Sequence, residues 1–368
     1  MSLFATTGRL ALKLVERKGS LQFKSRVIRI VYDRIFWASE PLQSIVESFS
    51  LGHKVGQQSG DGLYAFNNRF LGISTGYFAG QRLDVVQKIM LGLVPKLQNR
   101  GVKIFYKDTV LLLSTINVLQ DGLHMSAVSP ADNMPSEEKL LAMTGPGPSF
   151  SSFGKVNHLA RAFLFRRLDD ASSHIDISGT VTASHNLLNL HLLMGYFFEG
   201  LASFQLARQT CARESAKWID RGQSVLMKMR CWSESSLWNW ENKMLLLDAE
   251  RLFTIGDFNK AGSLYENAIQ SSREHKFVHE EAIASELAGM FYHERDLLKK
   301  SESYLAHSVS CYEKWGAHAV ARRVKAVMQG YFCTDADKIA PSAGAGCDAS
   351  LEYLFESNQV SQKKRLQG

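Results

Sequence analysis

The sequence predicts an all-α fold of stacked helical hairpins, similar to a tetratricopeptide-type superhelix. Three observations favour this class. No proline, the strongest helix breaker, occurs between Pro148 and Pro341. Apolar residues recur at spacings of three and four, which places them on one side of a helix. Glycine and short polar residues interrupt this pattern where one helix would turn into the next.

Composition and charge narrow the function classes. Of the 368 residues, 45% are hydrophobic and 21% are charged, so the chain can bury a core and is not globally disordered. Residues 1–36 carry a net +6 and residues 361–368 a net +3, so the remaining body is net −2 against a total of +7. A nucleic-acid binder is expected to carry a basic stripe on its folded body. We therefore expect no nucleic-acid partner.

Two further features concern localisation. The five cysteines form no CxxC pair, which is typical of reduced thiols in the cytoplasm, and no apolar run is long enough to span a membrane. The segment before Glu16 contains Arg, Lys and Thr but no acid, which also fits an organelle transit peptide. An amphipathic helix of the fold is the alternative. We expect a cytoplasmic protein, with organelle targeting as the second possibility.

Residues 1–120 are expected to form the first helical hairpins. Residues 40–56 have a single apolar stripe and form one helix of such a hairpin. Residues 64–94 show the same periodicity on both sides of Ala79-Gly80, where the chain would turn. Residues 121–155 concentrate proline, glycine and serine and predict an irregular loop, with one short helix near 136–143.

Residues 156–336 are expected to form tetratricopeptide-like repeats. The predicted turns fall at Gly200, at Gly256-Asp257 and at Arg295-Asp296. Residues 337–368 are expected to be a flexible linker, with a tail helix at 350–366.

One hairpin matches the tetratricopeptide pattern at five positions. Small or aromatic residues occupy the sites where two helices of such a unit approach each other: Ala249, Phe258, Ala261, Tyr265 and Ala268. The following unit lies 40 residues on and has Ser301 and Ser308 at two of the usual alanine sites. Trp238 and Trp240 cannot both face the same side of one helix, so one of them should be more exposed.

Three segments also resemble a known family over nearly the whole chain. They are residues 10–32, 40–61 and 248–317, of which FVHEEAIASELAGMFY followed by CYEKWGA is the most specific part. The chain resembles the helical-repeat region of very large signalling proteins. Those proteins carry a protein-kinase-like domain and a STAND-type ATPase upstream, and GAF with histidine-kinase or similar output domains downstream. The resemblance implies a non-catalytic middle region of a longer architecture.

No motif in this chain indicates catalysis, a cofactor or a metal. The segment SFSSFGKV at 149–156 resembles a Walker A loop, but Ser149 replaces its first glycine and Val156 its magnesium-binding Ser or Thr. His279 and Glu280 would begin an HExxH zinc motif, but Ile283 stands where the second histidine belongs. We expect Glu280 and Glu281 in the first turn of a helix instead. A catalytic site assembled from distant segments remains open.

The favoured function is a non-catalytic scaffold for protein–protein interaction or intramolecular signal relay. A stack of helical hairpins presents an extended inner face, and the repeat register places seven residues on it: Lys243, Glu250, Phe253, Glu286, Met290, His293 and Glu294. Because these residues are mostly acidic or apolar, we expect a basic or mixed partner with apolar anchors. The alternatives are a fragment of a multidomain ATPase or kinase whose catalytic domains lie outside this chain, and a free-standing adaptor.

Overall fold

The structure is a computed structural model, which describes residues 3–17, 20–99, 103–122, 148–175, 190–234 and 236–332. Within these ranges the chain forms fifteen α-helices, one short 3-10 helix and no strand. The predicted all-α class is therefore confirmed, as is the expectation that helices would hold more than half of the residues. No helix in this part of the chain is long and apolar enough to cross a membrane.

The helices follow one another with short connections. In the first part of the chain they are α1 (Leu3–Leu14), α2 (Leu21–Arg34), α3 (Leu42–Gln58), α4 (Gly62–Phe78), α5 (Leu83–Asn99) and α6 (Lys103–Asp121), with the 3-10 helix at Phe36–Ala38. The central helices are α8 (Pro148–Leu164), α9 (Leu168–His174), α10 (Leu190–Gln209) and α11 (Ala212–Ser233). The last five are α12 (Leu237–Ile255), α13 (Phe258–Glu274), α14 (Val278–Glu294), α15 (Leu298–Trp315) and α16 (His318–Phe332).

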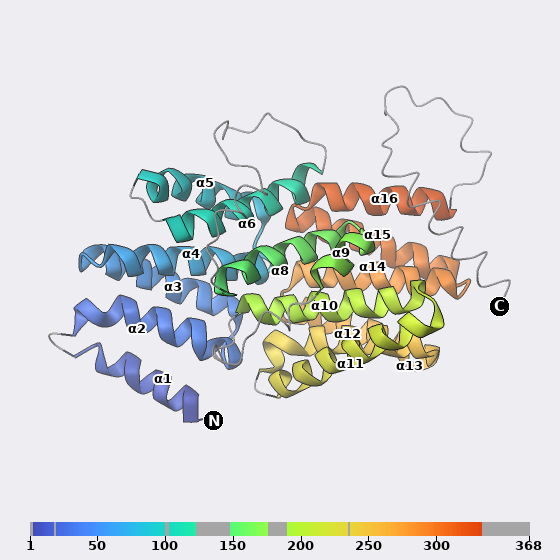
Figure 1. Cartoon of the computed structure of the whole chain (residues 1–368), viewed down its shortest axis with the longest axis horizontal. Helices are drawn as coiled ribbons and strands as arrows, with labels where there is room; N and C mark the ends of the chain where they lie inside the picture. The colour runs from blue at the N-terminus through green and yellow to red at the C-terminus, as the bar shows by residue number, and fades with distance from the viewer. Residues whose placement is uncertain are drawn as a thin grey trace, which may run out of the picture.

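Consecutive helices pack as antiparallel neighbours, and the stack is elongated (Figure 1). Helix α8 packs between α6 and α10, α10 packs against both α11 and α12, and α16 packs on α6 (Figure 1). One hydrophobic core runs through the early, central and late helices. The regions predicted as 1–120 and 156–336 therefore share a core.

Polar contacts join the two regions at their border. The backbone N–H of Leu42 donates to Asn239 Oδ1 at 3.1 Å. The Asn239 amide in turn donates to the carbonyl oxygens of Trp37 and Glu40, at 2.9 and 2.7 Å. The rings of Trp37 and Trp240 meet edge to face with centroids 5.8 Å apart. The start of α12 is thus tied to the turn between α2 and α3.

Three predicted turns are confirmed. Gly80 separates α4 from α5 with φ +81°, and Asp296 separates α14 from α15 with φ +56°. Gly256 ends α12 in the left-handed conformation, and Asp257 caps α13 by accepting a hydrogen bond from the Lys260 N–H. These turns depend on residues that are close in sequence, which explains why local patterns could locate them.

The predicted turn at Gly200 is wrong. This glycine lies inside α10, and the chain turns about ten residues later, between Gln209 and Ala212. A Cβ atom at Gly200 would lie 2.6 Å from Leu247 Cδ2 and 3.0 Å from Val225 Cγ1. The glycine therefore serves the close approach of α10 to α11 and α12, and a helical glycine of this kind looks like a turn in the sequence.

The predicted loop at 121–155 is also partly wrong. Helix α8 begins at Pro148, so residues 148–155 are helical rather than irregular. Pro148 explains the helix start, since proline is well tolerated in a first turn. The short helix expected near 136–143 and the linker and tail helix expected at 337–368 lie outside the described residues.

The repeat register predicted for α12 and α13 agrees with their packing. Ala249, Ala261, Tyr265 and Ala268 have no measurable exposure. In the following unit the serines at alanine sites are also buried, and each donates to a carbonyl oxygen of α14. Ser301 donates to Gly289 at 2.8 Å and Ser308 to Ala282 at 2.9 Å. Trp240 is fully buried and Trp238 is 36% exposed, as predicted for this pair.

Two glycines test this packing in opposite directions. A Cβ at Gly289 would lie 2.6 Å from Leu305 Cγ and 3.2 Å from the Leu305 backbone nitrogen, so Gly289→Ala must displace α15. We expect a loss of about 1–3 kcal/mol in the free energy of unfolding. A Cβ at Gly92, inside α5, meets nothing within 4 Å, so Gly92→Ala should stabilise the helix by about 0.5–1 kcal/mol. Urea unfolding of both variants checks this, and a loss of stability in both would contradict it.

Candidate functional site

The seven residues predicted to line the inner face lie on α12 and α14, but most of them are not accessible. Lys243 has no exposure, Glu250 and Glu286 are 1% exposed and Phe253 is 7% exposed. Met290 and His293 are half-buried, and Glu294 alone is exposed. The expectation of an open groove at the four buried residues is therefore wrong. The physical reason is that other segments of the same chain cover this face.

Helix α10 covers the part of the inner face around Glu250. Arg208 Nη2 lies 2.6 Å from Glu250 Oε2, and the Tyr265 hydroxyl donates to the other carboxylate oxygen. The Arg208 guanidinium also sits 4.3 Å from the centroid of the Phe253 ring. Burial alone would lower the pKa of Arg208, but the charge of Glu250 raises it above its ordinary value. Arg208 thus supplies, from within the chain, the basic group and the contact with Phe253 that were expected from a partner.

Two arginines from other elements enclose Glu286. Arg166 Nη2 and Arg323 Nη2 both lie 2.7 Å from Glu286 Oε1, and the Tyr312 hydroxyl donates to Oε2 at 2.9 Å. Burial would raise the pKa of Glu286, but the two guanidinium groups lower it. Arg166 follows α8 and has φ +58°, a conformation that non-glycine residues adopt rarely. The ion pair therefore holds a turn in place as well as joining α8, α14 and α16.

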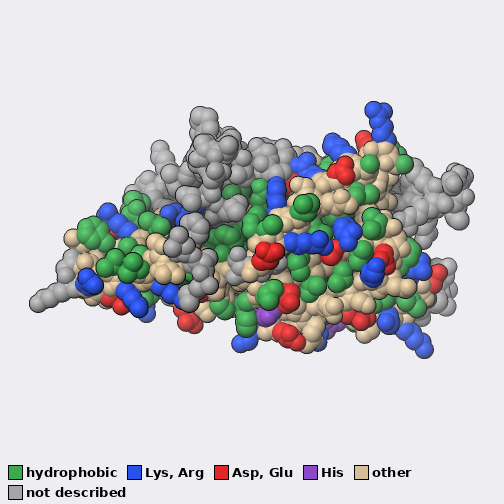
Figure 2. All heavy atoms as spheres, turned by 90° about the horizontal axis from the view of Figure 1, so that it is seen from below, with side chains coloured by type: hydrophobic (Ala, Val, Ile, Leu, Met, Phe, Trp, Pro, Cys, Tyr) green, Lys and Arg blue, Asp and Glu red, His purple; other side chains and the backbone are tan. Residues whose placement is uncertain are grey.

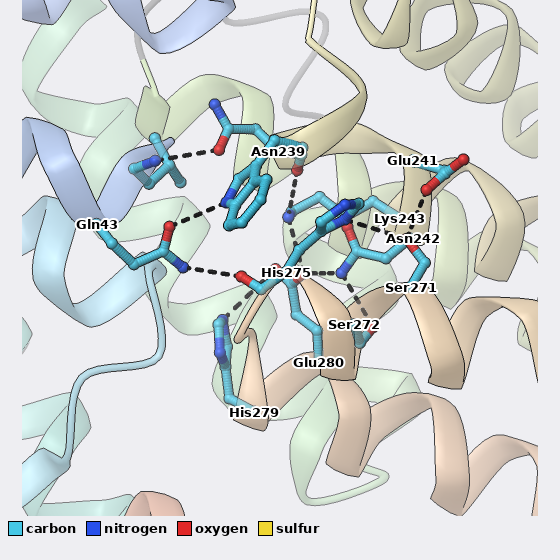
Figure 3. Close-up of polar contacts among 12 residues, drawn as sticks. Gln43, Asn239, Glu241, Asn242, Lys243, Ser271, Ser272, His275, His279 and Glu280 are labelled. Atoms are coloured by element: carbon cyan, nitrogen blue, oxygen red, sulfur yellow. Dashed lines mark hydrogen bonds and ion pairs between the residues drawn. The ribbon is translucent and has the colours of Figure 1, made fainter. Parts of the chain in front are cut away.

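Lys243 belongs to a third buried cluster, which Figure 3 shows in detail. Its ammonium donates to Glu280 Oε2 at 2.8 Å and to the Asn239 carbonyl at 2.7 Å (Figure 3). It also lies 4.2 Å from the Phe277 ring centroid. Asn242 donates to the same Glu280 oxygen. Burial lowers the pKa of Lys243 and raises that of Glu280.

His279 lies beside this cluster, with its Nε2 3.5 Å from Glu280 Oε1. The pKa of His279 is lowered to about 3, mainly by burial and secondly by the nearby charge of Lys243. The ring lies against Trp315, with centroids 5.1 Å apart, and next to Gly80. Glu280 and Glu281 lie in the first turn of α14, as predicted. This histidine is therefore neutral at physiological pH and contributes to packing.

The three ion clusters act as clamps between elements far apart in the sequence. Each is enclosed, and none of its ionic groups lines the cleft around His53 and Lys96 or the small pocket around His158. General acid–base chemistry needs a side chain within hydrogen-bond reach of a substrate. The clusters lack that access here, and a buried pair that loses one partner is strongly destabilised. Their geometry fits a structural role.

Two other candidate sites also have a structural explanation. The Walker-like segment at 149–156 lies inside α8, so its backbone is helical and cannot form a phosphate-cradling loop. Glu281, His307 and Cys311 lie close enough together to suggest a metal site. However, Arg273 Nη2 lies 3.2 Å from His307 Nε2, and Arg273 Nε donates to Glu281 at 2.8 Å. The Arg273 guanidinium thus already contacts two of the three groups that would have to bind a metal.

The sequence reasoning missed a surface on the first two helices, which we call the N-terminal apolar face. Its large apolar side chains are between 44% and 56% exposed: Leu10, Leu14, Phe23 and Ile30. Leu21 is also exposed but, two residues before Phe23, it lies on the opposite side of α2. Figure 2 shows hydrophobic side chains at the left end of this view, where α1 and α2 lie, with Lys and Arg around them. The inward side of α1 is buried at Ala5 and Val15, so this helix is part of the fold.

Comparison with models of known protein families gives no match, and neither does comparison with curated proteins. The resemblance to the helical-repeat region of large signalling proteins therefore stays a prediction.

Proposed function

We propose that the chain is a non-catalytic helical-repeat scaffold, which binds a helical segment of a partner protein, or of a neighbouring domain in a longer polypeptide, on the N-terminal apolar face. The supporting observation is the exposure of four large apolar side chains on two adjacent helices. Consecutive hairpins of the stack cover many of each other's apolar side chains, although single ones such as Met227 and Ile255 are also exposed. A helix that packs on this face would continue the same mode of packing.

The positive charge near the N-terminal apolar face determines which kind of partner helix would bind there. Residues 1–36 carry a net +6. Lys13 and Arg17, next to Leu14, are exposed. A second copy of this chain would bring like charges together, which is unfavourable. A helix with an apolar stripe flanked by Asp and Glu complements both properties of the face.

The buried ion clusters support a role as a rigid support or relay. They connect α10 with α12, and α8 and α16 with α14. A contact at the N-terminal end would therefore be transmitted through one shared core rather than through independent repeats. In a larger signalling protein, such a body would hold flanking domains in a defined arrangement. The proposal includes a cytoplasmic location, which the free thiols of Cys211, Cys231 and Cys311 support.

A pair of designed peptides tests the proposed surface. The first is an amphipathic helix with a leucine stripe flanked by glutamates, and its twin has lysine at every glutamate. Fluorescence anisotropy should show at least about tenfold tighter binding of the acidic peptide, because opposite charges meet across the contact. The double variant Phe23→Glu/Ile30→Glu should lose this binding, because it places two negative charges in the apolar contact. Both side chains are about half exposed, so we expect the variant to remain folded.

The matched control is Leu297→Glu/Leu298→Glu at the turn into α15. These residues are 48% and 49% exposed, which matches Phe23 and Ile30, but they lie on another part of the molecule. The control variant should bind the acidic peptide like the wild type. Equal affinity for both peptides, or equal loss in both double variants, would show that the N-terminal apolar face is not the recognition surface.

A further inference from the structure

A cleft of about 690 Å³ lies between α3, α4 and α5. Its walls come from α3 around His53 and Gly56, from the α3–α4 turn, from the first half of α4 and from the second half of α5. The cleft lies at the start of α4 and the end of α5, on the side of these helices that is far from their connecting turn at Gly80 (Figure 1). This cleft is separate from the buried clusters and from the N-terminal apolar face.

The charges around this cleft are all of one sign. Arg69, Lys88 and Lys96 line it, and none of its lining residues is acidic. Among the described residues, no acidic side chain pairs with these three cations. Asp61, which caps α4 beside the cleft, is already paired with Arg26 at 2.6 Å. The cleft therefore holds an uncompensated positive charge.

Two of the lining side chains are partly withdrawn from water. Arg69 is half-buried, and burial lowers its pKa. His53 is also half-buried, and its pKa is lowered by burial first and then by the charges of Arg69 and Lys96. His53 Nδ1 lies 2.8 Å from the Ala65 carbonyl, which can only accept, so this nitrogen carries the proton. A bound anion would offset the repulsion among these groups.

The remaining walls are small or apolar. Gly60 and Gly92 lie along the cleft, and a Cβ at either would meet nothing within 4 Å, so a ligand can approach the backbone closely there. Phe66, Ile89 and Leu93 add an apolar wall. The volume falls within the range of roughly 300–1,000 Å³ that is common for small-molecule sites.

We propose that this cleft binds a small organic phosphate, with its phosphate groups against Arg69, Lys88 and Lys96 and its ring or apolar part against Phe66, Ile89 and Leu93. The guanidinium fork of Arg69 suits bidentate contact with phosphate oxygens, and the two lysines supply further charge. A concave cleft of this size between three helices favours a discrete molecule over a flat lipid surface or an extended peptide. This site is independent of the proposed scaffold function.

Isothermal titration calorimetry with three soluble probes tests the proposal: ADP, inorganic pyrophosphate and adenosine. ADP should bind more tightly than pyrophosphate, and adenosine should not bind detectably, because the charges provide most of the attraction and the apolar wall adds to it. Arg69→Gln should weaken ADP binding about ten- to hundredfold. Lys88→Gln and Lys96→Gln should each weaken it by a smaller factor.

A steric variant and a charge control complete the test. Gly92→Trp places a ring in open space and should block ADP without disturbing the helix packing, since a Cβ there meets nothing within 4 Å. Lys54→Gln removes the same kind of charge from an exposed position of α3 that does not line the cleft, and it should bind ADP like the wild type. Circular dichroism confirms that each variant remains helical.

Three results would overturn the proposal. The first is the absence of ADP and pyrophosphate binding to the wild type. The second is ADP binding that Arg69→Gln and Gly92→Trp leave unchanged. The third is binding only to phosphatidylinositol-phosphate vesicles, which would assign the cleft to a membrane surface. Equal affinities for ADP and pyrophosphate would overturn the assignment of the apolar wall to the ligand.

Discussion

Glu286→Gln is expected to lower the free energy of unfolding by about 3–5 kcal/mol. The substitution keeps the size of the side chain but removes the negative charge that Arg166 and Arg323 share, each at 2.7 Å. Both guanidinium groups have side chains that are only 8% exposed, so water cannot replace the lost partner. Urea unfolding monitored by circular dichroism measures the effect.

Two controls separate the ion pair from a general effect of losing a glutamate. Glu302→Gln changes an exposed residue of α15 and should shift the free energy of unfolding by less than about 0.5 kcal/mol. Replacing Glu286, Arg166 and Arg323 together by methionine should recover most of the stability lost in Glu286→Gln, because no unpaired charge is left buried. If Glu286→Gln were no more destabilising than Glu302→Gln, the cluster would not clamp the fold.

His279 gives a second large effect, which depends on pH. Its pKa is about 3 in the folded chain, against an ordinary value of 6.5. Below pH 6.5 the unfolded chain therefore takes up a proton that the folded chain does not. The contribution of His279 to the free energy of unfolding falls by about 1.4 kcal/mol for each pH unit between about 6.5 and 3.

The comparison with His279→Phe isolates this contribution. Phenylalanine keeps a ring against Trp315 and Phe277 but binds no proton. Lys243 and Glu280 are the charged groups that face the ring, and both stay in the variant. The stability difference, wild type minus variant, should therefore change little between pH 7.5 and 6.5 and fall from pH 6.5 to pH 5 in urea unfolding experiments. Parallel stability curves over this range would contradict a neutral, buried His279.

Local sequence patterns were sufficient to predict most helices and turns, but not which other segments of the chain would pack over them. The turns at Gly80 and Gly256 need a residue that tolerates positive φ, and this requirement is visible in a few neighbouring residues. Position 200 needs a glycine for a different reason, because Leu247 and Val225 of other helices approach it closely. Sequence spacing does not distinguish these two uses of glycine.

The inner face shows the same limit. The register placed Glu250 and Glu286 on an open inner groove, but their exposure depends on what packs there. Arg208 lies 42 residues from Glu250, and Arg166 lies 120 residues from Glu286. Helical periodicity carries no information about contacts over such separations. The expected basic partner of these glutamates is supplied within the chain, and whether a second protein also reaches this face stays a prediction.

The two surfaces proposed for binding were harder to recognise for a related reason. The apolar residues of α1 and α2 look like ordinary core residues in the sequence, and only the structure shows that several are exposed. The cations of the cleft are dispersed, since Arg69 is on α4 while Lys88 and Lys96 are on α5. The local excess of basic residues near the N-terminus was the one signal that pointed to this end of the molecule.

Hydrogen–deuterium exchange with and without the acidic helical peptide tests the central claim, that the inner face is filled by the chain itself and that recognition occurs on the N-terminal apolar face. We predict slow exchange in α12 and α14 without the peptide, and added protection confined to α1 and α2 when the peptide is bound. Fast exchange in α12 and α14 of the free chain, together with peptide-induced protection there, would contradict the account.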